Sequence, residues 1–438
     1  MKHKKFRKPI SIVLVATMAA SCLSTGLTAS AATLWLPDGE QALGKAQPRI
    51  SGYRMKDVRE WDSQTDPFAE MMQAKVPLQE RNEAFKPTQA NPELESDAQV
   101  MLMQTDYNGY AFDNFLYNND FSQNMLNYWQ YVDYFCPWHG AATADTPSAL
   151  YGENEYAILN IPNPAYTNAA HKNGVVSIAC LYFDQTNRRG QSINELLEKD
   201  EEGNFLLVDK LVDIANYYGF DGYFLNREET PYSDEVLRDF MKQLKDKGMY
   251  TQYYDSWTDG FNPDAGPWVQ DGTYDSVFFN YGGWYNANEA YEYSQEHGMD
   301  VYKWAFLGLE CARGKFDFND QISNGYIPGT KNPYASVALF TPNDFYQCGV
   351  DFGSWGAKPS FQRPEYQWMV AQRERMFFSG VTQDPTDTGL HEGYARPDLG
   401  VDEAGGWVGT ADFTAERSVI DGSVFYTNFN TGHGMQYF

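Results

Sequence analysis

The sequence predicts one large α/β domain, a (β/α)8 barrel, preceded by an export signal. From about residue 100, short apolar segments alternate with amphipathic helical segments, the order expected of parallel strands joined by crossover helices. Eight such apolar segments are present, and aromatic residues follow several of them, which favours a closed barrel over an open doubly wound sheet. No glycine-rich phosphate-binding turn follows the early strands.

The eight predicted strands are short and rich in aromatic and β-branched residues, as strands usually are. They are residues 128–135, 175–183, 220–226, 249–255, 276–281, 301–310, 335–342 and 423–430. Residues 381–417 are rich in Gly, Asp and Thr and read as a long insertion before the last of these strands.

Two helices are predicted on either side of the strand at 220–226. The second has Ser233 as its N-cap and Gly248 as its stop, and carries one apolar face of Leu237, Phe240, Met241 and Leu244. The first carries a single apolar stripe of Leu207, Leu211, Ile214 and Tyr218.

We expect an export signal at the start of the chain and further domains beyond its end. Residues 1–31 have five basic side chains, an apolar run and a small-residue cleavage site at Ala31, which predicts a secretory signal and an extracellular, secreted or cell-surface protein. A membrane anchor is disfavoured because polar residues interrupt the run, and Cys22 lies in a poor lipidation context. Residues 32–97 are expected to be a lead-in segment and 98–438 the barrel, with C-terminal accessory β domains missing.

Charge and composition limit the kinds of molecule that the protein is expected to bind. The formal net charge of -26 becomes -31 when the five basic residues of the signal are removed. Such an acidic surface repels phosphates, so neither nucleic acid nor insertion into a membrane after signal cleavage is expected. Six scattered histidines and no paired-cysteine or zinc pattern predict no metal and no cofactor. Four widely spaced cysteines, Cys136, Cys180, Cys311 and Cys348, are expected to be buried free thiols more often than disulfides.

The segment FDGYFLNREET, residues 220–230, places polar groups where a buried strand ends. Side chains alternate along a strand, so Phe224, Asn226 and Glu228 share one face while Leu225 and Arg227 share the other. In a parallel barrel this end is the catalytic face. For an isolated Asn-x-Glu, a solvated loop is the commoner explanation.

The surrounding segments resemble glycoside hydrolase family 85, the endo-β-N-acetylglucosaminidases. DGYFLNRE resembles the catalytic strand of that family, and further similar segments follow in order: residues 167–183, 253–256, 278–284, 336–344 and 428–434. The resemblance covers residue 50 to the end. Residues 308–317 depart from the family pattern, and Glu310 puts the contacts of that loop in doubt. The chitinases of family 18 carry two more acids on this strand, where the present chain has Phe224 and Asn226.

The resemblance implies cleavage between the two core GlcNAc residues of N-glycans, by a substrate-assisted route. Glu228 would be the general acid and base, Asn226 would hold the acetamido group of the sugar, and Tyr254 would fix the acetamide or Glu228. The residues expected to bind substrate are Trp257, Trp268, Asn280, Tyr281 and Trp284. His171 is expected to be a structural histidine.

Two alternatives remain open from the residues alone. One is a retaining glycosidase with two carboxylates, in which Glu310 or Asp344 is the nucleophile. The other is a barrel without activity that binds glycans at the cell surface.

Overall fold

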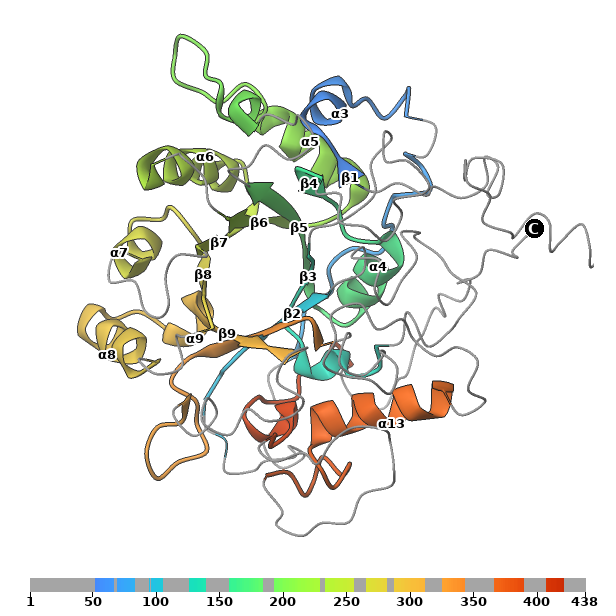
Figure 1. Cartoon of the computed structure of the whole chain (residues 1–438), viewed down its shortest axis with the longest axis vertical. Helices are drawn as coiled ribbons and strands as arrows, with labels where there is room; N and C mark the ends of the chain where they lie inside the picture. The colour runs from blue at the N-terminus through green and yellow to red at the C-terminus, as the bar shows by residue number, and fades with distance from the viewer. Residues whose placement is uncertain are drawn as a thin grey trace, which may run out of the picture.

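A closed barrel of eight parallel strands forms the centre of the structure (Figure 1). The computed structural model describes residues 52–66, 69–82, 94, 96–104, 126–138, 157–183, 193–228, 233–255, 265–281, 287–311, 325–342, 366–389 and 407–420. In order around the barrel, the strands are β2 (Val100–Gln104), β3 (Tyr134–Pro137), β5 (Val176–Phe183), β6 (Gly222–Arg227), β7 (Tyr250–Asp255), β8 (Ser276–Phe279), β9 (Ala305–Glu310) and β10 (Ser336–Phe340). The pairing of β10 with β2 closes the ring, which confirms the predicted fold.

The barrel closes through a strand that the sequence did not reveal. Residues 100–104 form β2, whereas the strand predicted at 423–430 lies outside the described residues. Two predicted strands also begin too early, because 129–131 form a short 3-10 helix, η3 (Trp129–Tyr131), and 301–304 form the helix α9 (Val301–Trp304). The strand that carries Asn226 is therefore the fourth of the barrel.

Two short antiparallel strands extend the sheet beside β5. Strand β4 (Leu159–Asn160) pairs with β5, and β1 (Gly52–Tyr53) pairs with β4. The lead-in segment thus contributes a strand of its own and the helix α3 (Met55–Glu60), which contacts α5 (Val208–Tyr218).

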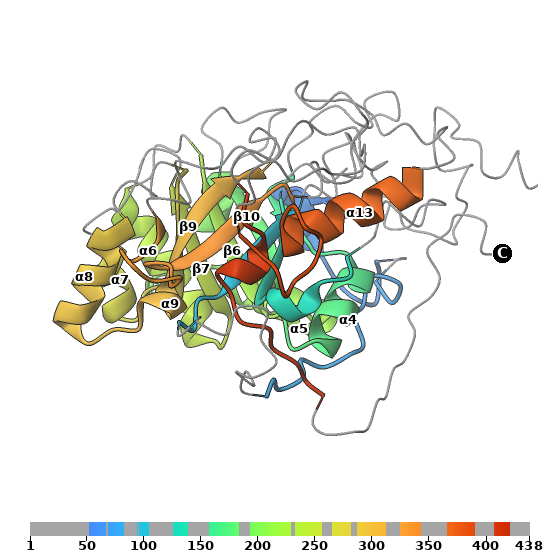
Figure 2. The ribbon, with the colours of Figure 1, turned by 90° about the horizontal axis from the view of Figure 1, so that it is seen from below.

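Helices surround the barrel on its outside (Figure 1). In addition to α5 they are α4 (Pro164–Lys172), α6 (Asp234–Asp246), α7 (Ala265–Gln270), α8 (Ala287–His297) and α13 (Tyr366–Ser379), with the 3-10 helices η6 (Ile193–Leu197) and η8 (Thr410–Asp412). Figure 2 shows α13 beside β10, on the side away from α6, α7 and α8. The two predicted helices are confirmed. Gly219 ends α5 in the left-handed conformation, although Ser233 begins α6 without a side-chain cap.

The core has two parts separated by the strands. Residues of one parity, such as Tyr223, Leu225 and Tyr253, face the helices, and those of the other parity, such as Phe224 and Phe278, fill the barrel. Cys136, Cys180 and Cys311 are buried free thiols, as predicted, and Cys348 lies outside the described residues. None of the described helices is long and apolar enough to cross a membrane.

A buried ion-pair group holds the N-terminal ends of the strands. Asp133 accepts hydrogen bonds from Arg81 (3.0 Å) and Arg417 (3.4 Å), and from the backbone N–H of Val100 (2.8 Å). These residues bring the lead-in segment, the barrel and the C-terminal region together. Removal of Asp133 would leave the buried Arg81 guanidinium without this carboxylate, and loss of one partner of a buried ion pair typically costs about 3–5 kcal/mol.

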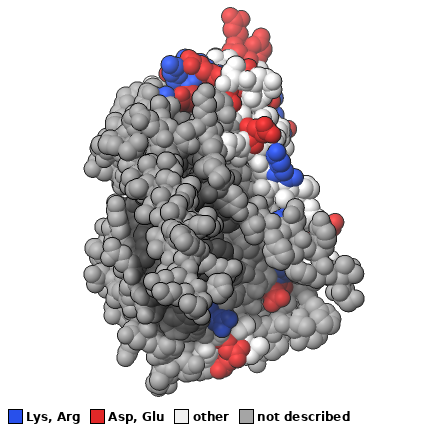
Figure 3. Space-filling model, turned by 90° about the vertical axis from the view of Figure 1, so that its right-hand side faces the viewer, with Lys and Arg blue, Asp and Glu red and all other residues white. Residues whose placement is uncertain are grey.

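Charged side chains of both signs lie close together on the surface. Among the described residues on the face in Figure 3, Lys and Arg side chains sit beside Asp and Glu. Exposed pairs such as Arg238 with Asp271 (2.7 Å) contribute little each, about 0–1 kcal/mol.

His171 is a structural histidine, as predicted. Its Nδ1 lies 2.6 Å from the carbonyl oxygen of Val76 and its Nε2 lies 2.9 Å from Oδ2 of Asp221. Burial lowers the pKa of His171, but the hydrogen bond and the charge of Asp221 outweigh burial, so the pKa is raised. Because both partners are acceptors, the geometry favours the protonated ring.

The raised pKa of His171 predicts a pH-dependent contribution to stability. The contribution is complete below the ordinary histidine pKa of about 6.5 and is lost as the pH rises through the higher pKa of the folded state. In urea unfolding, wild type should therefore lose more stability between pH 6 and pH 8 than His171→Gln does. Equal losses in the two proteins would contradict this assignment.

Gly222 is predicted to be irreplaceable at the start of β6. A Cβ there would lie 2.6 Å from the backbone nitrogen of Tyr250 and closer still to its oxygen. Gly222→Ala should lower the free energy of unfolding by about 3 kcal/mol, the upper end of the usual cost of overpacking, because the backbone of a paired strand cannot move away. Gly203→Ala is the control, since its positive φ costs only about 1–2 kcal/mol and no atom lies within 4 Å. Equal losses would refute the clash.

Candidate active site

The end of β6 presents Asn226 and Glu228 to the inside of the barrel mouth. Their shared face is as the alternation predicts, since both line the same cavity as Phe224. In the sheet register, Asn226 lies opposite Tyr254 of β7 on one side and Tyr182 of β5 on the other. The amide, the acid and the tyrosine proposed from the sequence are therefore brought together by neighbouring strands.

Hydrogen bonds fix β6 at both ends. Before the strand, the carboxylate of Asp221 accepts hydrogen bonds from the backbone N–H of Ser177 (2.7 Å) and from Nε2 of His171. After the strand, the N–H of Glu228 donates to the carbonyl of Phe183 (2.8 Å), so pairing with β5 continues through the acid itself. The backbone of Glu228 thus belongs to the sheet.

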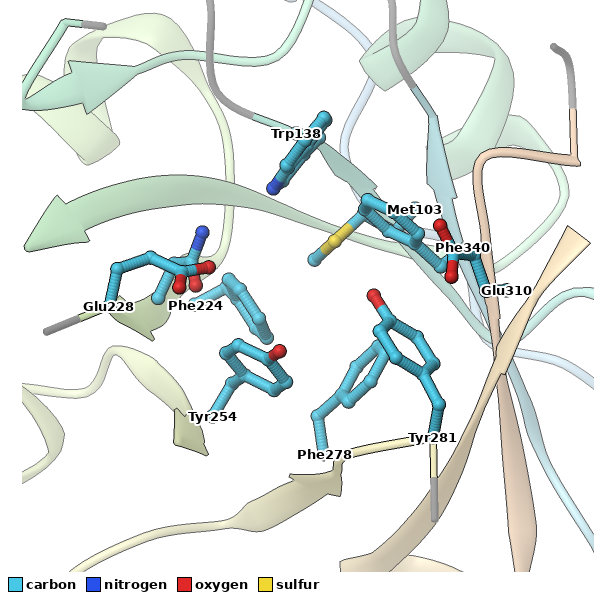
Figure 4. A pocket seen from close by; sticks show the side chains of 10 residues that line it. Met103, Trp138, Phe224, Glu228, Tyr254, Phe278, Tyr281, Glu310 and Phe340 are labelled. Carbon is cyan, nitrogen blue, oxygen red and sulfur yellow. The ribbon is translucent and has the colours of Figure 1, made fainter. Parts of the chain in front are cut away.

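The cavity has a volume of about 200 Å³. This is below the roughly 300–1,000 Å³ usual for ligand pockets. The lining side chains come from seven of the eight strands or the residues just after them (Figure 4): Met103, Trp138, Phe224, Asn226, Glu228, Tyr254, Phe278, Tyr281, Glu310 and Phe340.

Aromatic rings in mutual contact form most of the wall. Tyr254 stacks on Phe224 with centroids 6.1 Å apart and meets Phe278 edge-on at 5.2 Å. Phe340 lies 5.7 Å from Tyr281 and 4.7 Å from Trp138. Such rings present flat apolar faces, which suit a ligand with an apolar side.

Asn226 is buried with an unmet hydrogen bond. Its side chain is 1% exposed, and its Oδ1 has no hydrogen-bond partner among the described residues. The amide oxygen and nitrogen are nearly equal in size, so a half-turn of the group exchanges them without changing the packing. Among the residues that the structure describes, no partner of Oδ1 opposes that turn. The amide is thus available to a ligand in the cavity.

The two carboxylates of the cavity lie on different walls. Figure 4 shows Glu228 on one side and Glu310 on the other, next to Phe340. The strands that carry them, β6 and β9, are separated by β7 and β8.

The buried thiol of Cys180 on β5 stays protonated. Burial and, to a lesser degree, the charge of Glu228 raise the pKa of this thiol.

The predicted substrate contacts divide into three groups. Tyr281 lines the cavity, and Asn280 lies beside it with its Oδ1 accepting the N–H of Tyr281 (2.7 Å). The prediction that Trp268 binds substrate is wrong. Its side chain is 7% exposed and lies in the core between the strands and the helices, edge-on to Tyr253 at 5.7 Å. Trp257 and Trp284 lie outside the described residues.

Four lining residues were not predicted from the sequence. They belong to or follow strands β2, β3, β8 and β10, and are Met103, Trp138, Phe278 and Phe340. The sequence could have predicted Trp138 as a lining residue, because Trp138 follows an apolar segment as Tyr281 does. It could not have predicted Met103, because the strand that carries Met103 was not recognised.

Among the described residues, no group of three or more His, Cys, Asp or Glu side chains is placed to hold a metal ion.

A parallel barrel with an acid and an amide in its aromatic mouth has the architecture of a sugar-cleaving enzyme. The model of the family described as "Glycosyl hydrolase family 85" matches residues 107–437, which is more than half of the chain. The chain therefore belongs to glycosyl hydrolase family 85, and the match includes Asn226, Glu228 and Tyr254.

Named relatives agree with this assignment. A cytosolic endo-beta-N-acetylglucosaminidase of Danio rerio is 27% identical over 59% of this chain, and that of Mus musculus is 26% identical over 60%. The chain spans 36% and 35% of their lengths, about a third in each case. The glycoside hydrolase domain of Endo-D from Streptococcus pneumoniae R6 shares the fold, with a TM-score of 0.60, 22% identity and coverage of 84% of this chain and 54% of that one.

The unmet oxygen of Asn226 predicts a gain in stability on its removal. A buried polar atom without a partner costs about 1–3 kcal/mol, so Asn226→Leu should raise the free energy of unfolding by about 1 kcal/mol. Asn160→Leu is the matched control, because the Nδ2 of Asn160 donates to the carbonyl of Ala157 (3.0 Å) and its loss should destabilise. A destabilised Asn226→Leu in urea unfolding would show that the amide is satisfied.

Proposed function

We propose that this chain is an exported endo-β-N-acetylglucosaminidase that cleaves the GlcNAc-β-1,4-GlcNAc core of N-linked glycans, most readily those of the high-mannose type. One observation carries the proposal: Asn226 and Glu228 share the inner face of β6 beside Tyr254, in one cavity. Family membership supports the activity, and the named relatives carry it in their descriptions.

The first chemical step follows from the nature of the two side chains. Glu228 donates a proton to the glycosidic oxygen as that bond breaks. The acetamido oxygen of the same sugar attacks its anomeric carbon and forms a protonated oxazoline (an oxazolinium ion), whose nitrogen keeps its proton. Asn226 accepts the hydrogen bond of the acetamido N–H, which orients the group without offering a competing nucleophile.

The second step returns the enzyme to its starting state. Glu228, now ionised, removes a proton from water as the water attacks the anomeric carbon and opens the oxazolinium ring, which restores the neutral acetamido group and the protonated acid. The configuration at that carbon is retained after the two displacements. Tyr254, 8% exposed and held between Phe224 and Phe278, is placed to hold the acetamide or Glu228.

The position of Glu310 argues against a mechanism with two carboxylates. A retaining pair needs its carboxyl groups about 5 Å apart. Glu310 projects from the wall opposite Glu228, three strands away around the barrel (Figure 4). Asp344, the other candidate nucleophile, lies outside the described residues. In the substrate-assisted route, the acetamido oxygen of the sugar takes the role of the second carboxylate, and Asn226 orients the acetamido group.

The remaining parts of the proposal concern location and partners. The signal predicted at residues 1–31 supports export, and the partners are N-glycans on glycoproteins. Nucleic acid is not proposed as a partner because the net charge is -26 even with the signal present. The alternative function is that of a glycan-binding surface protein without activity. Such a protein would not need the acid Glu228 beside the amide of Asn226.

Digestion of a high-mannose glycoprotein tests this function. Wild type should leave a single HexNAc on the polypeptide, seen by mass analysis, while Glu228→Gln and Asn226→Ala should slow release by about a thousandfold or more. An active Asn226→Ala together with an inactive Asp344→Asn would favour two carboxylates. Complete removal of the glycan, with Asn converted to Asp, would refute the proposal, and binding without turnover would identify the lectin alternative.

A further inference from the structure

Arg227 stands between Asn226 and Glu228 in the sequence but belongs to the other face of β6. Alternation puts Arg227 with Leu225 on the outer face, and Leu225 is part of the core between the strands and the helices. The cavity lining includes the residues on both sides of Arg227 and not Arg227 itself. The side chain of Arg227 therefore lies behind the site.

Behind the site, Arg227 bonds to the neighbouring strand. Its Nη1 donates to the hydroxyl of Tyr253 at 3.0 Å. Tyr253 directly precedes Tyr254, as Arg227 directly precedes Glu228. The register pairs Leu225 with Tyr253, so the bond runs diagonally between β6 and β7 across the outer surface. It ties the last residue of β6 to the strand that carries the tyrosine.

On the β5 side, a backbone hydrogen bond holds the end of β6. The N–H of Glu228 donates to Phe183 of β5 at 2.8 Å. The pairing of β6 with β7 ends at Arg227, opposite Asp255, and the side chain of Arg227 adds a bond to β7 at this last pair. Without the added bond, Glu228 would be held past the end of the strand only on the β5 side, and its carboxyl group could shift.

Tyr253 is a rigid partner for this anchor. It is 2% exposed, stacks on Tyr274 with centroids 5.0 Å apart, and meets Trp268 edge-on. Arg238 covers the ring of Trp268 at 4.9 Å and pairs with Asp271. Trp268, expected from the sequence to bind sugar, instead holds Tyr253 in place from outside.

We propose that Arg227 is a positioning residue, which through the Tyr253 hydroxyl fixes the distance between Glu228 and Tyr254. The inference rests on the proposed function and adds a residue to it. Displacements of about 1 Å of a reacting group can lower rates by about a hundredfold. Binding depends less on this distance, because the aromatic wall around the cavity stays intact.

Steady-state kinetics on a high-mannose glycopeptide test the proposal with two variants. Tyr253→Phe removes only the hydroxyl, and Arg227→Met removes the guanidinium with little change in length. Each should lower kcat between about 10-fold and 100-fold, with KM within about 2-fold of wild type. Arg227→Lys, which keeps one donor, should recover part of the loss, and the double variant should be no slower than the slower single one.

Arg238→Met is the control for a purely structural role. It removes the outer support of the same aromatic group, so it should lower Tm while leaving kcat unchanged. If Tyr253→Phe also lowers only Tm, Arg227 has no positioning role. If kcat falls in Arg227→Met but not in Tyr253→Phe, or if the pH profile shifts only in Arg227→Met, charge and not position is responsible and the proposal is overturned.

The two proposals fail in distinguishable ways. Wild type that leaves no HexNAc on the glycopeptide refutes the proposed function. Wild type that leaves HexNAc, with Tyr253→Phe as fast as wild type, refutes the role of Arg227 alone.

Discussion

The position of β6 between β5 and β7 is the constraint on which the site depends. Six residues of β6 pair with each neighbour, and these parallel pairings fix which side chains point inward. A shift of one residue would turn Asn226 and Glu228 toward the helices and bring Arg227 into the barrel. Closure of the ring through β10 and β2 prevents that shift, because no strand of the barrel has a free edge along which to slide.

Stability and chemistry occupy opposite ends of the barrel. At the N-terminal ends of the strands, Asp133 gathers the lead-in segment and the C-terminal region into a satisfied network of charges. At the mouth, Asn226 keeps a buried oxygen without a partner among the described residues. An unmet polar group lowers the stability of a fold, so a ligand that meets it recovers energy which the free protein lacks. The predicted opposite effects of Asn226→Leu and Asn160→Leu follow from this difference.

The aromatic residues serve two separate surfaces. On the inside, Phe224, Tyr254 and Phe278 surround the space beside the acid. On the outside, Tyr253 and Trp268 pack between the strands and the helices. Adjacent residues of one strand, Tyr253 and Tyr254, thus belong to different cores.

Local pattern in the sequence determined the elements and their faces, and tertiary contact determined which faces meet. The alternation in β6 was sufficient to place Asn226 with Glu228, and the helices α5 and α6 were evident from their apolar stripes, because these signals depend on neighbours along the chain. The strand at Val100–Gln104, the contribution of Met103 and Phe340 to the cavity, and the core position of Trp268 were not evident. Each depends on pairing or packing between segments far apart in sequence, and a tryptophan after a strand carries no mark of whether a helix will bury it.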